Sequence, residues 1–246
     1  MSGEYDASTY GERMAEVYDQ WVRVPKNADA VVAFLAGLAG RGPVLELGIG
    51  TGRIALPLSQ RGVELHGIDA SPSMVAKLKA KPGGDRIRIT IGDFATVPVE
   101  GRFSLVFVVF NTFFGLLTQE DQIGCFEAVA RHLVDDGLFV IEAFVPDLSR
   151  FDRGQRVEAL SVDADAVVLD ASVHDRVAQR IVAQHVLMSN RGVQLYPVKL
   201  RYAWPSELDL MARLAGLRLR ERWSGWNREP FSAASASHVS VYRRPT

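Results

Sequence analysis

The sequence is poor in cysteine and has no long apolar run. Cys125 is the single cysteine among 246 residues, so no intrachain disulfide can form, which fits a reducing compartment. An iron–sulfur enzyme, which needs a cluster of cysteines, is excluded. The longest apolar stretch, Phe103 to Leu117, is too short for a membrane span and is interrupted by Asn111 and Thr112. We expect no membrane-spanning segment.

Excess positive charge is also missing. The 28 Lys and Arg residues are balanced by 29 Asp and Glu, which gives a net charge of −1, so we expect no nucleic-acid partner. The few lysines among many arginines, together with abundant Ala, Gly and Val, indicate a bacterial source. Met1 to Glu4 lack the basic and apolar regions of a signal peptide, so we expect a cytoplasmic protein. We expect no metal site.

A glycine-rich turn is the main motif. An apolar run, Val44 to Leu47, predicts a buried strand, and Gly48, Gly50 and Gly52 follow at alternate positions before a predicted helix. Such a turn between a parallel strand and a helix is where doubly wound α/β domains bind adenosine cofactors. Dinucleotide enzymes use G-x-G-x-x-G, but Arg53 occupies the place of the third glycine. That replacement opposes an NAD-dependent oxidoreductase.

Polar residues also follow the next predicted strands. Asp69 ends the strand Val63 to Asp69, about 20 residues after the first glycine, which is where an acid can accept hydrogen bonds from ribose hydroxyls. Asp93 and Phe94 come after the strand Ile87 to Ile91. Asn111 comes after the strand Phe103 to Phe110, which is apolar on both faces as a central parallel strand should be.

The pattern E-x-G-x-G-x-G from Glu46 to Gly52, followed by Asp69 and Asp93, resembles class I S-adenosylmethionine (SAM)-dependent methyltransferases. The resemblance covers Tyr10 to about Phe144 and the closing strands. It implies an α/β fold with a Rossmann-like, seven-stranded doubly wound sheet whose seventh strand is antiparallel. It also implies SAM as cofactor and S-adenosylhomocysteine (SAH) as product. The resemblance assigns cofactor contacts to Arg13, Tyr18, Glu46, Gly48, Gly50, Gly52, Asp69, Ala70, Met74, Asp93, Phe94 and Asn111.

Residues Thr9 to Trp21 predict an amphipathic helix with its aromatic side chains on one side. It either packs on the edge of the domain or covers the cofactor, as the N-terminal helix of many small-molecule methyltransferases does. A second helix is expected from Asn27 to Leu38. The domain prediction is an N-terminal helical cap (1–40), a cofactor-binding core (41–145), a β insert (146–204) and the C-terminal part of the core (205–246).

The predicted insert is an antiparallel sheet of three strands: Ala166 to Val173, Arg180 to Met188 and Val193 to Trp204. On the third strand Tyr196, Val198, Leu200, Tyr202 and Trp204 share one face. This apolar face must be covered. It either roofs the substrate pocket or joins two copies in a homodimer, and both remain open. The predicted pocket residues are Phe113, Phe114, Tyr196, Tyr202 and Trp204.

Methyl transfer from a sulfonium depends mainly on alignment and exclusion of water, and a base is needed only when the acceptor arrives protonated. The catalytic candidates are Tyr10, Glu142 and His185, and for His185 a structural role is an alternative. The layout resembles bacterial natural-product methyltransferases, including N-methyltransferases of amino sugars. Those enzymes place a histidine after strand four, where this chain has Phe113 to Leu116, which points to a larger or flatter acceptor.

The predicted function is transfer of a methyl group to a nitrogen or oxygen atom of a small molecule, for example a natural product. Two alternatives stay open. In the first, the methyl acceptor is a peptide or another protein. In the second, the chain binds SAM on this fold but catalyses another reaction.

Overall fold

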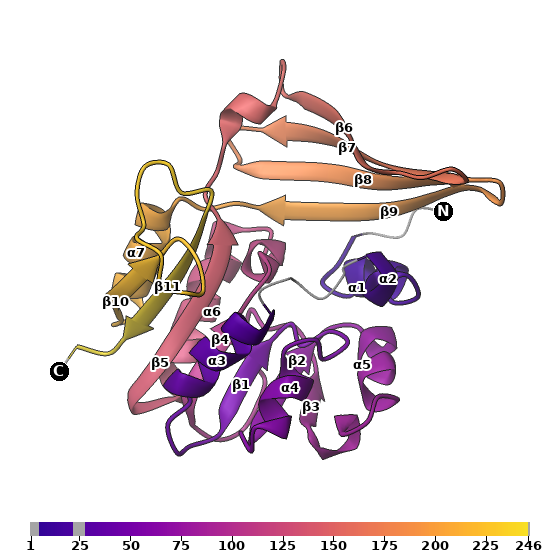
Figure 1. Cartoon of the computed structure of the whole chain (residues 1–246). Coiled ribbons are helices and arrows are strands. Elements are labelled where there is room, and N and C mark those ends of the chain that lie inside the picture. Colours follow the sequence, from indigo (N-terminus) through magenta and orange to yellow (C-terminus); the bar gives the residue numbers. More distant parts are fainter. Residues whose placement is uncertain (1–4, 22–27, 246) are drawn as a thin grey trace.

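The computed structural model describes residues 5–21 and 28–245. Its core is a seven-stranded sheet in the order β10-β11-β5-β4-β1-β2-β3 (Figure 1). The strands are β1 (Val44–Leu47), β2 (Leu65–Asp69), β3 (Arg88–Ile91), β4 (Phe103–Val108), β5 (Leu133–Phe144), β10 (Arg218–Trp223) and β11 (Ser237–Arg243). Only β11 runs antiparallel to its neighbours, β5 and β10. The predicted Rossmann-like sheet with an antiparallel seventh strand is therefore confirmed.

Helices cover both faces of this sheet. They are α3 (Ala28–Leu38), α4 (Ala55–Gln60), α5 (Pro72–Lys79), α6 (Gln119–His132) and α7 (Pro205–Leu214), with short 3₁₀ turns η1 (Gly84–Arg86), η2 (Thr112–Gly115) and η3 (Leu148–Arg150). One apolar core lies between the sheet and α6 and α7, and the other lies under α3 and α4. Both faces of β1 are buried, as expected for a central parallel strand. No helix in residues 5–21 and 28–245 is long and apolar enough to cross a membrane.

Capping residues fix where two of these helices begin. Ser71 is the N-cap of α5, its hydroxyl accepts a hydrogen bond from the Met74 amide, and Pro72 occupies the first helical position. Thr118 caps α6 in the same way, through the amide of Asp121. Both caps lie at the carboxyl edge of the sheet, so they also place the polar loops that follow β2 and precede α6.

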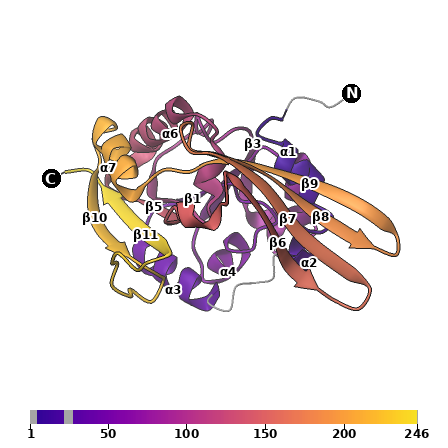
Figure 2. The same cartoon turned by 90° about the horizontal axis from the view of Figure 1, so that it is seen from above.

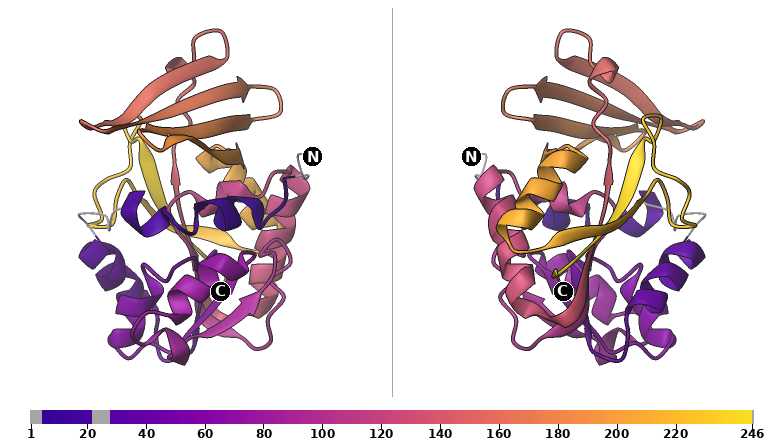
Figure 3. Two further views of the ribbon diagram at one scale, coloured as in Figure 1. Left: turned by 90° about the vertical axis from the view of Figure 1, so that its right-hand side faces the viewer. Right: turned by 90° about the vertical axis from the view of Figure 1, so that its left-hand side faces the viewer.

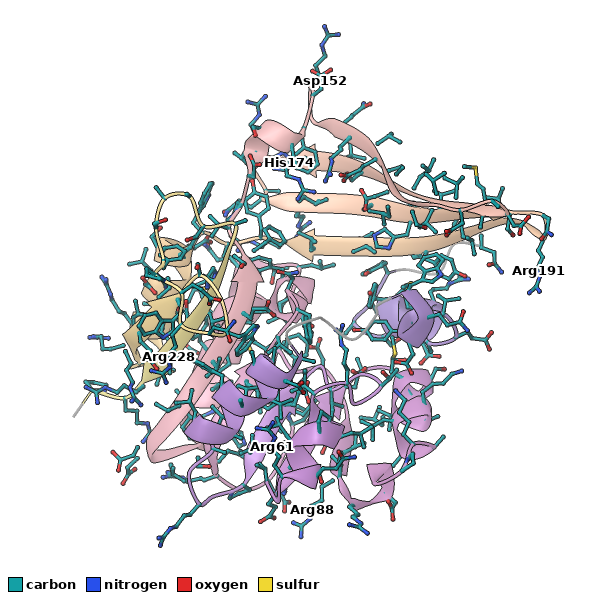
Figure 4. All side chains as sticks on the ribbon, viewed as in Figure 1. Arg61, Arg88, Asp152, His174, Arg191 and Arg228 are labelled. Atoms are coloured by element: carbon teal, nitrogen blue, oxygen red, sulfur yellow. The ribbon has the colours of Figure 1, made fainter. Side chains whose placement is uncertain are left out.

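The insert between β5 and α7 is a separate four-stranded antiparallel sheet, with β6 (Gln155–Val162), β7 (Ala166–Asp175), β8 (Arg180–Ser189) and β9 (Gly192–Arg201) in sequence order. It crosses above the carboxyl ends of the core strands (Figures 1 and 2). Figure 4 shows Asp152 and Arg191 at its outer tips and Arg88, at the amino end of β3, at the opposite pole. The prediction of three strands is wrong, because the sheet has a fourth strand, the edge strand β6, which is exposed along almost its whole length.

A buried polar network anchors the insert to the core. The Arg201 guanidinium, at the end of β9, donates to Gln122 of α6 at 2.6 Å and to Glu207 of α7 at 2.7 Å. The Gln122 amide in turn donates to the Arg201 carbonyl oxygen at 2.8 Å. Arg201 is 6% exposed, so these charge-assisted bonds replace the water that its buried guanidinium loses.

The N-terminal segment (residues 5–21) forms two short helices, α1 (Thr9–Met14) and α2 (Tyr18–Trp21), where a single helix was predicted. They lie between the insert and the core (Figure 3), and α1 contacts both β9 and α5. Of the two predicted placements, the structure therefore shows the cover over the strand ends. Asn27, the expected start of the next helix, and Met1 to Glu4 lie outside the described residues.

Candidate functional site

The glycine turn after β1 opens toward a cavity. Gly48, Gly50 and Gly52 have φ angles of +70°, +54° and +80°, a region that glycine enters without steric cost. A Cβ atom on Gly50 would meet nothing closer than 4.0 Å, whereas a Cβ atom on Gly52 would lie 2.8 Å from Cγ of Leu78. Gly52 does not line the cavity. Its predicted cofactor contact is therefore corrected to a packing role against α5.

Glu46 lies in β1 just before this turn and is 3% exposed. Its Oε2 atom has no hydrogen-bond partner among the residues that the structure describes. Burial raises the pKa of this carboxyl well above its usual value, although the Arg53 charge opposes the shift. Glu46 is not among the residues that line the cavity, but it stands two residues before the glycine turn, and a buried acceptor without a donor fits a ligand that brings a cationic donor, such as the amino group of SAM's methionine tail.

Asp69 at the end of β2 faces the same cavity. Its Oδ2 accepts a hydrogen bond from the Gly50 amide at 2.7 Å, and its Oδ1 accepts one from the Ser71 amide at 2.9 Å. Burial raises the pKa of Asp69 in spite of these two bonds. Each carboxylate oxygen has a second lone pair, so Asp69 can hold the glycine turn and also accept from a bound hydroxyl.

The loop after β3 completes this side of the cavity. Asp93 and Phe94 line it, as do Ala70 and Met74 from the loop and helix after β2. The Asp93 carboxylate accepts a hydrogen bond from the Ala95 amide at 2.8 Å. The three loops that follow β1, β2 and β3 (residues 48–52, 69–71 and 92–95) are called the cofactor loops below.

The loop after β4 has an unusual backbone. Phe110 and Asn111 both have positive φ, at 57° and 63°, which is costly for residues with a side chain. Glu142 of β5 holds this loop, since its Oε2 accepts from the Phe110 amide at 2.6 Å, and Asn111 Oδ1 accepts from the Phe144 amide at 2.7 Å. Burial raises the pKa of Glu142, which does not line the cavity as a catalytic group must.

Phe113 and Phe114 turn away from the cavity and are fully buried in the core. Their predicted pocket role is therefore wrong. The turn η2 directs them inward, where Phe113 packs against Phe126 and Phe114 against Phe144. The cavity is lined instead by the residues around them: Phe110, Asn111, Thr112, Gly115, Leu116 and Leu117.

The N-terminal segment closes the cavity above the cofactor loops, where Tyr10, Gly11 and Tyr18 line it. Burial raises the pKa values of Tyr10 and Tyr18, so both phenols keep their protons at neutral pH. Arg13 is exposed and is not among the residues that line the cavity, and its cofactor contact stays a prediction.

Arg53 is the cation that the sequence reasoning missed as a site residue. Its guanidinium carbon lies 3.7 Å from the centre of the Phe110 ring, and Nη2 donates to the Tyr18 hydroxyl at 3.2 Å. The sequence marks Arg53 only as the residue that replaces a glycine. Its contacts come from the loop after β4 and from α2, which are remote in the chain, so local spacing could not reveal them.

The insert supplies the opposite side of the cavity. The acceptor wall, as this side is called below, consists of Gly115, Leu116, Leu117, His185, Val198 and Leu200. His185 of β8 is directly opposite Asp170 of β7, and its Nε2 lies 3.1 Å from Asp170 Oδ2. The hydrogen bond from His185 is the largest cause that lowers the pKa of Asp170.

Tyr196, Tyr202 and Trp204 do not line the cavity. The Tyr196 ring is buried against Trp21 of α2, with ring centroids 4.7 Å apart. Strand β9 ends at Arg201, so Tyr202 and Trp204 leave the predicted strand face. Tyr202 bonds His174 at 2.9 Å between oxygen and Nε2, and Trp204 precedes α7 as its N-cap. The three predicted pocket roles are wrong for this reason.

The loops, the N-terminal segment and the acceptor wall line one cavity of about 430 Å³. Four acidic residues border it, Asp6, Asp69, Asp93 and Asp121, against one basic residue, Lys199. The Lys199 ammonium lies over the Tyr5 ring, 4.8 Å from its centre. The cavity therefore favours cationic ligands, of which a sulfonium is one.

A methyltransferase domain model matches residues 44–137. The chain is 43% identical to the CcbJ methyltransferase of Streptomyces caelestis, whose structure covers 98% of this chain and 100% of its own with a TM-score of 0.93. Cypemycin N-terminal methyltransferase from Streptomyces sp is 28% identical over 243 residues, which span 97% of this chain and 99% of that protein. SAM-bound CalS10, an amino pentose methyltransferase from Micromonospora echinaspora, shares the fold at 20% identity, with a TM-score of 0.67 over 92% of this chain and 96% of its own.

Proposed function

The chain belongs to the class I SAM-dependent methyltransferases, and we propose that it moves the methyl group of SAM to a nitrogen or oxygen atom of a small molecule held against the acceptor wall. One observation carries this proposal. A single cavity runs from the cofactor loops to the insert, so a methyl donor on one side and an acceptor on the other meet in the same space.

The residues present fit SAM. We assign the methionine tail to Glu46, Gly48 and Gly50, the ribose hydroxyls to Asp69, and the adenine to Asp93 and Phe94. The orphan oxygen of Glu46 and the open space over Gly50 support this assignment. When bound, SAM supplies an activated methyl group on a positively charged sulfur. The four carboxylates around the cavity favour that charge in the loaded enzyme.

The chain's own contribution is to bind, align and exclude water. Tyr10 stays protonated because burial raises its pKa, so it acts as a hydrogen-bond donor and orients an acceptor atom. Glu142 is a positioning residue, which fixes the strained Phe110–Asn111 backbone from behind through its bond to the Phe110 amide. The N-terminal segment shields both ligands from solvent.

The size of the cavity limits the acceptor. Cofactor and acceptor share a cavity of about 430 Å³ that is open to solvent on one side, so a small molecule fits within it and a peptide would insert its end. The name of cypemycin N-terminal methyltransferase keeps a peptide terminus as the second candidate. A nucleic acid is disfavoured, because four carboxylates line the cavity and would repel a polyanionic backbone.

We further propose that the insert pairs two copies of the chain. Residues directly opposite one another in an antiparallel sheet share a face, and Val173 pairs with Val182 and Met188 with Val193 on the side away from the cavity. The outer face, as this side is called below, exposes Val157, Val173, Val182, Met188, Val193 and Leu195. Contiguous exposed apolar surface of this kind is typical of an interface.

Calorimetry and mass spectrometry test the enzymatic proposal. We expect SAM and SAH to bind the purified chain and NAD not to bind. In the presence of SAM, a panel of amino sugars, hydroxylated aromatics and short peptides should include acceptors that gain the mass of one methylene group. Tight NAD binding without a SAM signal would refute the assignment. SAM binding with methylation of peptides alone would favour the second candidate.

A further inference from the structure

His185 and Asp170 form a paired imidazole and carboxylate on the insert that the cofactor contacts leave unused. Both lie on the inner face of the sheet, together with Tyr196 on β9, because these three residues are directly opposite in register. The His185 side chain is 24% exposed and the Asp170 side chain 17% exposed. His185 lines the cavity on the side opposite the cofactor loops, so its ring is within reach of an acceptor.

The pairing leaves one imidazole nitrogen free to act as a base. Nε2 lies 3.1 Å from Asp170 Oδ2, so a neutral ring that donates to this carboxylate carries its proton on Nε2 and its lone pair on Nδ1. In the described part of the chain, no hydrogen bond to Nδ1 of His185 is found. Asp170 is kept ionised by the His185 hydrogen bond, which lowers its pKa, with Ser172 and Arg156 acting in the same direction. A carboxylate behind the ring stabilises the imidazolium that forms on proton uptake.

The other titratable groups near the acceptor wall are poorer bases. Hydrogen bonds from Ser8 and Thr9 lower the pKa of Asp6, and the Asp121 carboxylate already accepts a bond from the Thr118 hydroxyl. Burial raises the pKa values of the two phenols Tyr5 and Tyr10, so these groups are proton donors. The charged and titratable groups that surround the ring are Asp170, Arg156 and Tyr196 of the insert, Glu16 of the N-terminal segment, and Tyr5, Asp6, Tyr10, Asp121 and Lys199 around the cavity.

The charge of the cavity indicates which acceptor needs this base. Four acidic residues line the cavity, Asp6, Asp69, Asp93 and Asp121, an arrangement that attracts a cation. Aliphatic amines are cations at neutral pH, and an ammonium has no lone pair with which to accept a methyl group. An amine drawn in by these carboxylates must therefore lose a proton inside the cavity, and an alcohol gains nothing from their charge.

We propose that the acceptor is an amine that binds as its ammonium and delivers one proton to Nδ1 of His185, with Asp170 holding the ring. In this step one N–H bond of the ammonium breaks and its electron pair stays on the nitrogen as the attacking lone pair. The proton bonds to Nδ1, and the imidazole becomes an imidazolium beside the Asp170 carboxylate. The total charge in the cavity is unchanged, and the proton leaves to water after the product departs. This inference rests on the proposed function.

Binding of matched amine–alcohol pairs tests the acceptor class without turnover. The probes are an alanyl peptide and its lactoyl counterpart, and methyl 3-amino-3-deoxyglucoside and methyl glucoside. They are titrated calorimetrically into the SAH-loaded enzyme. At least one amine should bind about tenfold more tightly than its alcohol, because one charged hydrogen bond is worth about that factor. The proposal is overturned if the alcohols bind as tightly or if no amine binds while SAH does. Failure of SAH itself to bind would refute the proposed function instead.

Kinetics of two variants test the role of the dyad. His185→Gln keeps an N–H that can reach Asp170 but has no basic nitrogen, and Asp170→Asn keeps the shape without the charge. Both should retain SAH affinity, which controls for folding. With the methylated amine, kcat of His185→Gln should fall roughly 100-fold at neutral pH, the usual contribution of a general base, with little change in KM. The loss should shrink as the pH approaches the pKa of the free amine.

Asp170→Asn should show a smaller loss with the same pH trend. A parallel drop at every pH, or a change in KM alone, would mean that His185 only shapes the wall, and would overturn the proton-transfer step.

Discussion

At the end of β1 the Glu46 carboxylate is buried, and one of its oxygens has no partner among the described residues. Burial raises its pKa well above the usual value of 4.5. An acid whose pKa is raised by folding costs stability once the pH exceeds the pKa of the unfolded chain, and costs nothing below it. Glu46 therefore weakens the ligand-free fold at neutral pH and remains available for the cofactor.

Glu46→Gln should accordingly melt at a higher temperature than the wild type at neutral pH without ligand. The difference should vanish as the pH falls below about 4.5, where both states of the wild type are protonated. SAM affinity should drop by roughly 1.5–3 kcal/mol, the value of a hydrogen bond to a charged group. Differential scanning calorimetry at several pH values, repeated with saturating SAH, provides the check. A ligand-free variant that melts below the wild type at neutral pH would contradict this account.

Asp69 serves the turn and the ligand at once. Asp69→Ala should weaken SAM binding by roughly 2–4 kcal/mol, because ribose hydroxyls lose a charged acceptor and the Gly50 amide loses its partner. Asp69→Asn should lose less, since its amide oxygen still accepts from one backbone amide. Isothermal calorimetry distinguishes these outcomes. An affinity within error of the wild type for both variants would show that Asp69 is only a turn residue.

Gly50 and Gly52 provide a matched pair, because both have positive φ and their surroundings differ. Gly50→Ala places a methyl group in open space, whereas Gly52→Ala drives it against Leu78. Each variant should lose about 1 kcal/mol of stability from backbone strain, and Gly52→Ala should lose more from the clash with Leu78. SAM affinity should fall more for Gly50→Ala. Melting curves and SAM titrations of both variants give the comparison, and the reverse order of affinities would remove Gly50 from the cofactor site.

At the scale of elements, two carboxylates latch the N-terminal segment onto the cofactor loops. Glu12 of α1 accepts hydrogen bonds from the Ser71 hydroxyl at 2.6 Å and the Ser73 hydroxyl at 2.7 Å. Asp19 of α2 accepts from the Thr51 hydroxyl at 2.6 Å and pairs with Lys81 at 2.7 Å. Because Tyr10 and Tyr18 of the same segment line the cavity, loosening this cover would open the cofactor side to solvent.

Asp19→Asn should speed the release of SAM by about three- to tenfold, since a hydrogen-bonded surface ion pair is worth about 1 kcal/mol. Hydrogen exchange of the α1 and α2 amides should quicken in parallel. Stopped-flow displacement and exchange mass spectrometry give the two rates. Glu16→Gln is the matched control, because Glu16 is an exposed carboxylate of the same segment with no hydrogen bond to the core in the described part of the chain. Equal release rates in both variants would show that the latch does not gate the cofactor.

Helices and strands with strong local sequence patterns could be predicted. The points where strands end, and the weakly patterned edge strand, could not. Buried β1 and β4 follow from their apolar runs, and α5 follows from Ser71 and Pro72 at its start. The exposed edge strand β6 carries no such pattern. Tyr202 and Trp204 continue the apolar alternation of β9, but the chain leaves the sheet at Arg201 because its guanidinium is bound to α6 and α7. A contact between distant elements thus ends a strand that local spacing would extend.

At the scale of the whole molecule, the cofactor side follows from sequence because each contact lies at the end of a parallel strand, and all such ends meet at one edge. The acceptor wall does not follow, since it depends on how the insert sits above that edge. The seven-stranded order was therefore predictable. That His185 lines the cavity could not be predicted, because it depends on how β8 and β9 pack over the N-terminal segment.

The position of Tyr196 shows which face of the insert is left without a partner. Its ring is covered by Trp21 of the same chain, so the predicted aromatic face needs no partner copy. The unpartnered surface is the outer face, where Val157, Val173 and Val193 are 71%, 55% and 64% exposed. Two such sheets stacked face to face would interdigitate their β-branched side chains as a β-sandwich does, and a stable interface needs about 800 Å² from each partner.

The proposed dimer predicts that the wild-type chain sediments with the mass of two copies, and that Val173→Asp combined with Val193→Asp sediments as one. Charges placed within an apolar interface lose hydration without gaining a partner, so association should fail. Val177→Asp is the matched control, because Val177 is 91% exposed in the turn between β7 and β8 and lies outside the strand register. SAH affinity should be unchanged in all three proteins, since the outer face lies on the side of the insert away from the cavity. A wild-type monomer, or a double variant that remains paired, would assign the outer face to another role.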